Sequence, residues 1–208
     1  TMKGDVNVFI SEYSAKQWGY KLLESVIIHH GIDTEVFKPK GLTRKPQLLS
    51  VVNDWVNRDW CCGFQLWQDV SRGKVVQVVG NTPGLSQPAK DVNELVNFYN
   101  TSQIFLNTSL ISPVPTSLLE PMSCGCAIVS TATCMIPEII INGVNGFTSN
   151  NPEELKDYCN MLLNNPRKCE KLGQAARKTI QERFSMENFI KQWDGLFTYV
   201  SENIYHKG

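Results

Sequence analysis

The sequence has 208 residues and a mass of 23.5 kDa, the size of about one domain, and such a chain can bury roughly 70% of its unfolded surface. Twenty Lys and Arg balance twenty Asp and Glu, and 42% of the residues are hydrophobic. This composition excludes a disordered chain and the broad basic surface of a nucleic-acid-binding protein, although a local cationic site remains compatible with it. No apolar run approaches the length of about 20 residues that a membrane span needs.

The chain contains an odd number of cysteines, and most of them lie within apolar stretches: Cys61, Cys62, Cys124, Cys126, Cys134, Cys159 and Cys169. This pattern favours free thiols in a reducing compartment over a disulfide framework. We therefore predict a cytoplasmic location, with peripheral attachment to a membrane as an alternative. Cys124 and Cys126 are expected to be buried thiols rather than half of a zinc site, because no histidine follows at finger-like spacing.

The chain begins with a predicted strand and helix. Val6, Val8 and Ile10 alternate with other residues as in a strand, and Ser11 is a candidate N-cap for a helix from Glu12 to about Tyr20. We expect no earlier strand for this first strand to pair with. An apolar run at 26–28 then leads into turn-forming residues up to Gly41, which predict a connector.

From residue 48 the pattern becomes a regular alternation of strands and helices. Short, nearly continuous apolar runs predict buried strands at 48–52, 74–79, 103–107 and 127–130. The segments between and after them are compatible with helices at 61–70, 91–99, 117–124 and 136–141. This alternation predicts an α/β fold with a Rossmann-like, doubly wound parallel sheet.

The last sixty residues are predicted to be helical. Two apolar stripes lie within 155–163 and 172–184 and are separated by Asn-Asn-Pro at 164–166. A third helix is expected to start at Ser185 as its N-cap and to carry Trp193 and Phe197. We interpret these stripes as core rather than as cofactor contacts.

The candidate binding residues lie in the loops that follow the predicted strands, because ligands of open parallel sheets bind outside the carboxyl ends of the strands. These residues are Asn53, Asp54, Arg58, Gly80, Asn81, Ser112, Pro115, Thr116, Ser117 and Glu120.

The segment 112–117 is the most informative of these loops. It places two prolines and several hydroxyl groups directly before a helix, so that free backbone N–H groups and the positive helix end favour an anion such as a diphosphate. The alternative is that Ser117 only caps the helix and forms a capping box with Glu120.

Two charged residues complete the predicted site. Glu120 on the first turn can accept hydrogen bonds from a vicinal diol such as a ribose. Arg58 is a candidate phosphate ligand, or alternatively a surface arginine paired with Asp54 or Asp59. The glycine-rich dinucleotide motif, the P-loop and the hydrolase nucleophile elbow are absent from the sequence.

Several spaced motifs resemble one known family. The stretch PTSLLEPMSCGCAIVST at 115–131, IPEII at 136–140 and NGVNGF at 142–147 are similar to the donor-binding core of family 4 glycosyltransferases, which have the GT-B fold. His30-Gly31-Ile32-Asp33 with Phe37 and Pro39 is similar to the interdomain linker of that family. The resemblance extends from about Ile27 to Phe197.

The resemblance implies a domain organisation. Its parts are a remnant of an N-terminal acceptor-type domain at 1–26, a linker at 27–41, the nucleotide-sugar donor domain at 42–184, and a C-terminal crossing helix and tail at 185–208. We expect the apolar stripe of the last helix to pack partly on 6–20. The remainder of the acceptor-type domain would be a missing segment or a partner chain.

The resemblance also implies retaining transfer of a hexosyl group from a nucleoside-diphosphate sugar, without a required metal or other cofactor. Glu120 matches the glutamate that binds the nucleotide ribose in the family, whereas Ser112 takes the place of the glutamate that contacts the donor sugar. Asn53-Asp54 and Cys62-Gly63 stand where the family has its two diphosphate-binding cations, and Arg58 is the proposed substitute. The acceptor, whether glycan, lipid or small molecule, and the catalytic residues are not specified.

Two other functions remain open at this point. A non-catalytic nucleotide-sugar-binding or assembly module is compatible with the departures at Ser112, Asp54 and Cys62. A sugar-nucleotide epimerase shares the two-domain fold, but it needs carboxylates and histidines that the sequence does not place.

Overall fold

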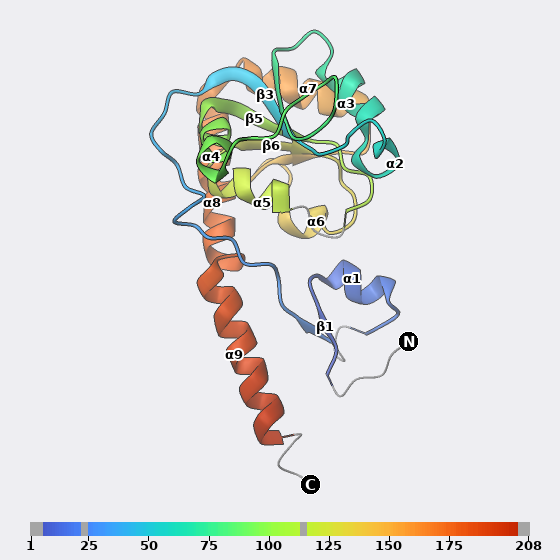
Figure 1. Ribbon diagram of the computed structural model, residues 1–208, viewed down its shortest axis with the longest axis vertical. Helices are drawn as coiled ribbons and strands as arrows, with labels where there is room; N and C mark the ends of the chain where they lie inside the picture. Colours follow the sequence, from blue (N-terminus) through green and yellow to red (C-terminus); the bar gives the residue numbers. More distant parts are fainter. Residues whose placement is uncertain (1–5, 22–24, 113–115, 204–208) are drawn as a thin grey trace.

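The structure is a computed structural model that describes residues 6–21, 25–112 and 116–203. Within these residues, five parallel strands form the central sheet in the order β4-β3-β5-β6-β7. The strands are β3 (Lys45–Val51), β4 (Val76–Val79), β5 (Ser102–Asn107), β6 (Ala127–Ser130) and β7 (Phe147–Thr148). The predicted α/β, Rossmann-like fold is confirmed, and Figure 1 shows the sheet between two layers of helices.

The order of the strands reverses at β3. This strand pairs with β4 on one side and with β5 on the other, so the chain builds the sheet first in one direction and then in the opposite one. At such a switch point the connections that follow two neighbouring strands run in opposite directions, which leaves a crevice at the carboxyl ends of these strands. Here these are the ends of β3 and β5.

Alternating side chains give the sheet two apolar faces, as the period of a strand requires. Leu49 and Phe105 belong to one core cluster, and Leu48 and Ile104 belong to the other. The first cluster is covered by α4 (Val92–Thr101), α5 (Thr116–Ser123) and α6 (Ile136–Ile139), and the second by α3 (Phe64–Ser71) and α7 (Pro152–Leu163). The long helix α8 (Pro166–Arg183) supplies residues to both clusters.

Two details differ from the sequence-based expectation. The helix predicted over 61–70 is divided at Gly63 into α2 (Asp59–Cys62) and α3. The strand β7 was not predicted, because two residues are too few to show alternation. The other predicted elements of the sheet domain are present, and none of their ends is shifted by more than three residues.

The N-terminal residues form a small unit of their own. It consists of β1 (Val8–Phe9), α1 (Glu12–Gln17) and β2 (Val26–Ile27), and β1 and β2 pair in parallel. The partner of the first strand is therefore a strand that follows it, at the apolar run 26–28 that the sequence analysis placed before a connector. The hydroxyl of Ser11 accepts a hydrogen bond from the Ser14 N–H at 2.9 Å, as predicted for an N-cap. The boundary drawn at residue 26 falls within β2.

The last helix, α9 (Met186–Asn203), extends beyond the sheet domain (Figure 1). Its N-cap is Ser185, whose Oγ accepts from the Asn188 N–H at 3.2 Å, as expected. Near its start, Phe189 lies so close to Gly31 that an added Cβ there would be 2.8 Å from the Phe189 Cβ. Phe197 is 61% exposed, and its ring centroid lies 5.4 Å from that of Trp193. The packing of this stripe on 6–20 stays a prediction. No helix in the described ranges is long and apolar enough to cross a membrane.

Candidate functional site

A cavity of about 350 Å³ lies at the switch point of the sheet. We call it the switch-point cavity. It is lined by Val51, Val52, Asn53, Arg58, Cys61, Cys62, Ser109, Ile111, Ser112, Thr116 and Ser117. It therefore brings together Asn53, Arg58, Ser112, Thr116 and Ser117, half of the residues that the sequence nominated.

Topology explains why residues so far apart in sequence meet here. Val51 ends β3, and Ser109 follows the end of β5 by two residues. Because β3 and β5 are parallel neighbours, their carboxyl ends and the loops that leave them lie at the same edge of the sheet.

The loop after β5 is attached to α2 by hydrogen bonds. The N–H groups of Leu110 and Ile111 both donate to the Cys61 carbonyl, at 2.8 and 3.1 Å. The Thr108 hydroxyl donates to the carbonyl of Cys62 at 3.1 Å. These bonds hold the walls formed by α2 and by 108–112 against each other.

The N-terminus of α5 forms another wall of the cavity. The helix begins at Thr116, so Ser117 lies in its first turn and the alternative interpretation of Ser117 as an N-cap with a capping box is wrong. The first N–H groups of an α-helix have no acceptor within the helix and carry its positive partial charge. This wall can therefore donate hydrogen bonds to an anion. Pro115 lies outside the described residues.

Arg58 supplies the positive side chain of the cavity. In the described part of the chain no carboxylate lies within 4.0 Å of its guanidinium, so the alternative pairing with Asp54 or Asp59 is not found. The two acids have other partners: Asp54 accepts from the Asn57 side chain at 2.7 Å, and Asp59 accepts from the Gln65 N–H at 2.9 Å. Arg58 is exposed and available to a ligand.

Three further predicted residues support the cavity without lining it. Asn81 donates its N–H to the Asn53 Oδ1 at 2.8 Å, and Asp54 donates its N–H to the Asn81 carbonyl at 2.7 Å. A Cβ at Gly80 would overlap the Val52 carbonyl oxygen, so the close approach of the two loops requires glycine there. Asp54, Gly80 and Asn81 thus hold the Asn53 loop in place.

Glu120 lies one turn further along α5 and faces Tyr99 of α4. The Tyr99 hydroxyl donates to the Glu120 Oε2 at 2.7 Å. Burial raises the pKa of Glu120 above its usual range, and the hydrogen bond from Tyr99 opposes that shift. Glu120 does not line the switch-point cavity, although it lies on the same helix as Thr116 and Ser117.

The predicted site residues do not include the adjacent cysteines of the cavity wall, Cys61 and Cys62, although the resemblance placed Cys62 at the position of a diphosphate-binding cation. The Sγ atoms of Cys61 and Cys62 are 3.6 Å apart. Burial, followed by the hydrogen bond with Cys61, raises the pKa of Cys62 to about 11. The signal was present in the spacing, because Cys61 and Cys62 follow Arg58 by three and four residues, which is one helical turn.

A larger cavity, of about 520 Å³, lies at the opposite edge of the sheet. The switch-point cavity is nevertheless the better candidate for the principal site. It combines the ends of the diverging strands, a helix N-terminus and a free guanidinium, which is the arrangement that binds phosphate groups in open α/β sheets.

Comparison with known proteins agrees with this fold. Residues 87–179 match the family model described as glycosyl transferases group 1. An uncharacterized glycosyltransferase of Methanocaldococcus jannaschii is 29% identical over 110 residues, which cover 51% of this chain and 28% of that protein. Alpha-maltose-1-phosphate synthase of Mycobacterium tuberculosis is 22% identical over 210 residues, covering 80% of this chain and 54% of the synthase.

Solved structures show the same fold over nearly the whole chain. Sucrose-phosphate synthase from Thermosynechococcus elongatus superposes with a TM-score of 0.80 at 16% identity, covering 96% of this chain and 59% of that chain. Anabaena HepE in complex with UDP also gives 0.80, at 15% identity, covering 94% of this chain and 64% of that chain.

The chain spans about half the length, or less, of these curated relatives. Residues 87–179 are thus similar to the group 1 glycosyl transferases, and the chain has the α/β Rossmann-like fold of its GT-B structural neighbours.

Proposed function

We propose that this chain is the donor-binding half of a retaining, family 4-like glycosyltransferase, and that the switch-point cavity binds the diphosphate of a nucleoside-diphosphate sugar. The observation that carries the proposal is the position of Arg58 and of the α5 N-terminus on the same cavity at the switch point. Structures of Anabaena HepE in complexes with UDP and with UDP-glucose give a precedent for such a donor on this fold.

The chemical task of the cavity is to stabilise the departing diphosphate. When the bond between the sugar and the diphosphate breaks, negative charge develops on the leaving oxygen. The first N–H groups of α5 and the guanidinium of Arg58 are oriented donors that can stabilise this charge. The transfer so proposed uses no separate cofactor or metal ion.

The remaining donor contacts follow from the same placement. Asn53 uses its Oδ1 for Asn81, which leaves its amide N–H groups to donate to the ligand. Ser112 lines the cavity where the donor sugar is proposed to lie, and its hydroxyl can both donate and accept. Glu120 lies on α5 beyond the lining of the cavity; its Oε1 is the proposed acceptor for a ribose hydroxyl, while its Oε2 accepts from Tyr99. The acceptor is proposed to approach from outside the carboxyl edge of the sheet.

Isothermal titration of the 208-residue chain with UDP, GDP and ADP tests the binding step. One nucleotide should bind, and Arg58→Gln should weaken it about tenfold or more, since a hydrogen bond to a charged group contributes about 1.5–3 kcal/mol. Arg72→Gln is the matched control, because Arg72 is an exposed arginine outside the cavity. If none of the nucleotides binds, the assignment of the site is wrong.

A non-catalytic nucleotide-sugar-binding module is the second candidate. The observation that favours it is that Arg58 is the sole cationic side chain among the described residues that line the cavity. An assay with a nucleoside-diphosphate sugar separates the two candidates. The compound carries the base of the nucleotide that binds and a radiolabel in its sugar. Release of nucleoside diphosphate with transfer of the sugar to an acceptor or to water supports the enzyme. Binding without any release supports the module when the chain is also joined to an acceptor-type domain.

A further inference from the structure

The larger cavity lies at the edge of the sheet where the strands begin. We call it the amino-edge cavity. It is lined by Pro39, Leu42, Arg44, Pro46, Gln103, Cys124, Gly125, Pro166, Cys169, Glu170, Gly173, Gln174 and Arg177. Pro46 and Gln103 lie at the starts of β3 and β5, whereas the switch-point cavity lies at their ends. The two cavities are therefore separate.

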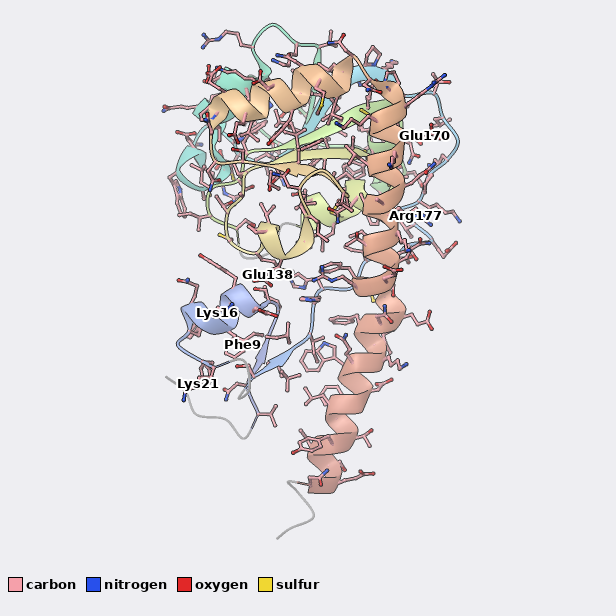
Figure 2. All side chains as sticks on the ribbon, turned by 180° about the vertical axis from the view of Figure 1, so that it is seen from behind. Phe9, Lys16, Lys21, Glu138, Glu170 and Arg177 are labelled. Atoms are coloured by element: carbon pink, nitrogen blue, oxygen red, sulfur yellow. The ribbon has the colours of Figure 1, made fainter. Side chains whose placement is uncertain are left out.

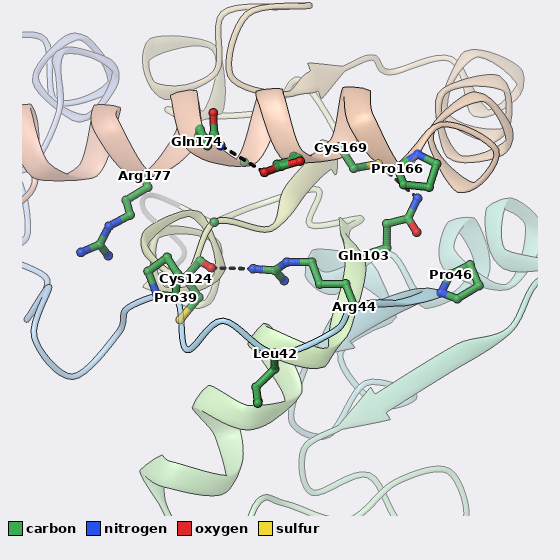
Figure 3. A pocket seen from close by; sticks show the side chains of 13 residues that line it. Pro39, Leu42, Arg44, Pro46, Gln103, Cys124, Pro166, Cys169, Gln174 and Arg177 are labelled. Atoms are coloured by element: carbon green, nitrogen blue, oxygen red, sulfur yellow. Dashed lines mark hydrogen bonds between the residues drawn. The ribbon is translucent and has the colours of Figure 1, made fainter.

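Arg44 lies on one wall of this cavity and is held by backbone carbonyls. Its guanidinium donates to the carbonyls of Tyr99 at 2.6 Å, Ser102 at 2.8 Å and Cys124 at 2.6 Å. Figure 3 shows Arg44 reaching towards Cys124 beneath α8. Neutral carbonyls fix the position of the guanidinium but leave its full positive charge in place.

Arg177 of α8 is held in the same way. It donates to the carbonyls of Ser123 at 2.7 Å and of Phe37 at 3.3 Å. Among the described residues, neither Arg44 nor Arg177 has a carboxylate within 4.0 Å. Burial raises the pKa of Cys124, which lines the same cavity, and the charges of Arg44 and Arg177 oppose this rise.

One acid, Glu170, is present among the residues that line the cavity, so the formal charge of the lining is positive. Glu170 is exposed and accepts a long hydrogen bond of 3.4 Å from Gln174. With two arginines and one glutamate, the lining carries a formal net charge of +1 and faces a cavity of about 520 Å³. This volume lies within the range of small-molecule sites.

The remaining walls are largely apolar, with Gln103 and Gln174 as their neutral polar side chains. Pro39, Pro46 and Pro166 supply rigid rings, and Leu42 is 45% exposed at the rim. The backbone of α8 packs closely on Gly125 at this cavity, since a Cβ at Gly173 would overlap the Gly125 carbonyl oxygen. A ligand suited to these walls needs an apolar body as well as a negative group.

We propose that the amino-edge cavity binds a small organic anion with an apolar body, such as an aromatic carboxylate or sulfonate. The anionic group lies towards Arg44 and Arg177, and the apolar body lies against Leu42 and the prolines. This site is independent of the proposed donor site and does not require it.

The probe for the test is 8-anilinonaphthalene-1-sulfonate, added to the 208-residue chain. N-phenyl-1-naphthylamine, which has the same skeleton without the sulfonate, is the matched neutral probe. Two-dimensional NMR locates each probe, because the amide signals of Gly125 and Gly173 report on the cavity and that of Gly195 reports on α9. We expect the sulfonate to shift the first two signals and to bind about tenfold more tightly than the neutral probe.

Two variants at exposed positions test the charge argument without disturbing the clamps of Arg44 and Arg177. Leu42→Glu adds a negative charge to the apolar rim and should weaken the sulfonate about tenfold, whereas Glu170→Gln should tighten it about threefold. Val75→Glu, at a site that is 67% exposed and outside the cavity, is the matched control and should change nothing.

The proposal is overturned if the two probes bind equally well. It is also overturned if the sulfonate shifts Gly195 but neither Gly125 nor Gly173, or if Leu42→Glu and Val75→Glu have the same effect. Since a circular dichroism spectrum checks that each variant is folded, a loss of binding can be assigned to the cavity.

Discussion

The carboxylate of Glu138 accepts a hydrogen bond from the backbone N–H of Tyr13 at 2.7 Å, although the two residues are 125 positions apart. Its second oxygen accepts from the N–H of Glu12 at 3.2 Å. Glu138 belongs to α6 of the sheet domain, and Figure 2 shows it next to α1 of the N-terminal unit. The sheet domain therefore supplies an acceptor for the free N–H groups at the start of α1.

Glu138→Ala should loosen the N-terminal unit. The variant leaves two N–H groups of α1 without their acceptor, and losses of this kind cost about 1–2 kcal/mol. Hydrogen exchange of the α1 amides should accelerate about tenfold, while exchange in β5 stays unchanged. Glu182→Ala, an exposed acid of α8 paired with Lys178, is the control. Unchanged exchange in α1 would show that the contact does not stabilise the unit.

Gly63→Ala should be strongly destabilising. Gly63 has φ +65°, and an added Cβ would overlap the Thr108 carbonyl oxygen. The substitution therefore combines backbone strain with a clash at the wall of the switch-point cavity, and we expect a loss of at least about 2–3 kcal/mol.

Gly73→Ala provides the matched control for the clash. Gly73 has nearly the same backbone conformation, with φ +74°, but no atom lies within 4 Å of its Cβ position. Its loss should be about 1 kcal/mol, the cost of the left-handed conformation alone. Urea unfolding of both variants measures the difference, and equal losses would mean that the contact with Thr108 relaxes freely.

The stability contributed by Glu120 should depend on pH. Burial raises its pKa in the folded protein, so between the ordinary and the raised pKa the folded state binds more protons than the unfolded state. Stability from this group therefore falls as the pH rises through that window. Glu120→Gln removes the effect, so its free energy of unfolding relative to wild type should be higher at pH 7 than at pH 4.

Tyr99→Phe tests the same pair from the other side. The hydrogen bond from the Tyr99 hydroxyl opposes the rise in the pKa of Glu120. Its removal should therefore increase the loss of free energy of unfolding between pH 4 and pH 7. Urea unfolding at the two pH values gives both results. If wild type and Glu120→Gln differ by the same amount at pH 4 and pH 7, the carboxylate is not penalised by burial.

Alkylation should distinguish the cysteines. The thiolate is the reactive form, and Cys62 is buried with a pKa of about 11. Iodoacetamide at pH 8 should therefore modify the half-buried Cys134 before Cys62, and the rate at Cys62 should rise about tenfold per pH unit up to about pH 11. Peptide mapping by mass spectrometry measures both rates, and faster labelling of Cys62 at pH 8 would contradict the prediction.

A nucleotide bound in the switch-point cavity should slow the labelling of Cys62 further. Cys159, a buried thiol of α7 outside the cavity, is the control and should not respond to nucleotide. An equal response at the two cysteines would indicate a general change in stability rather than protection by the ligand.

The candidate site was predictable in part. Residues at strand ends and at the start of α5 could be nominated because parallel strands bring their carboxyl ends to the same edge, and Asn53, Arg58, Ser112, Thr116 and Ser117 do meet there. Cys61 and Cys62 were not nominated, because their spacing of one helical turn from Arg58 does not by itself show that α2 borders the cavity.

By itself, the sequence determined the alternation of strands and helices and the parallel sheet, because hydrophobic periodicity and helix caps are local properties of the chain. The tertiary structure alone decided the pairing of β1 with β2, the contact of Glu138 with α1, and the carbonyl-held arginines of the amino-edge cavity. Each of these depends on contacts between residues far apart in the chain. Such contacts are fixed by how the elements pack and leave no periodic mark in the sequence.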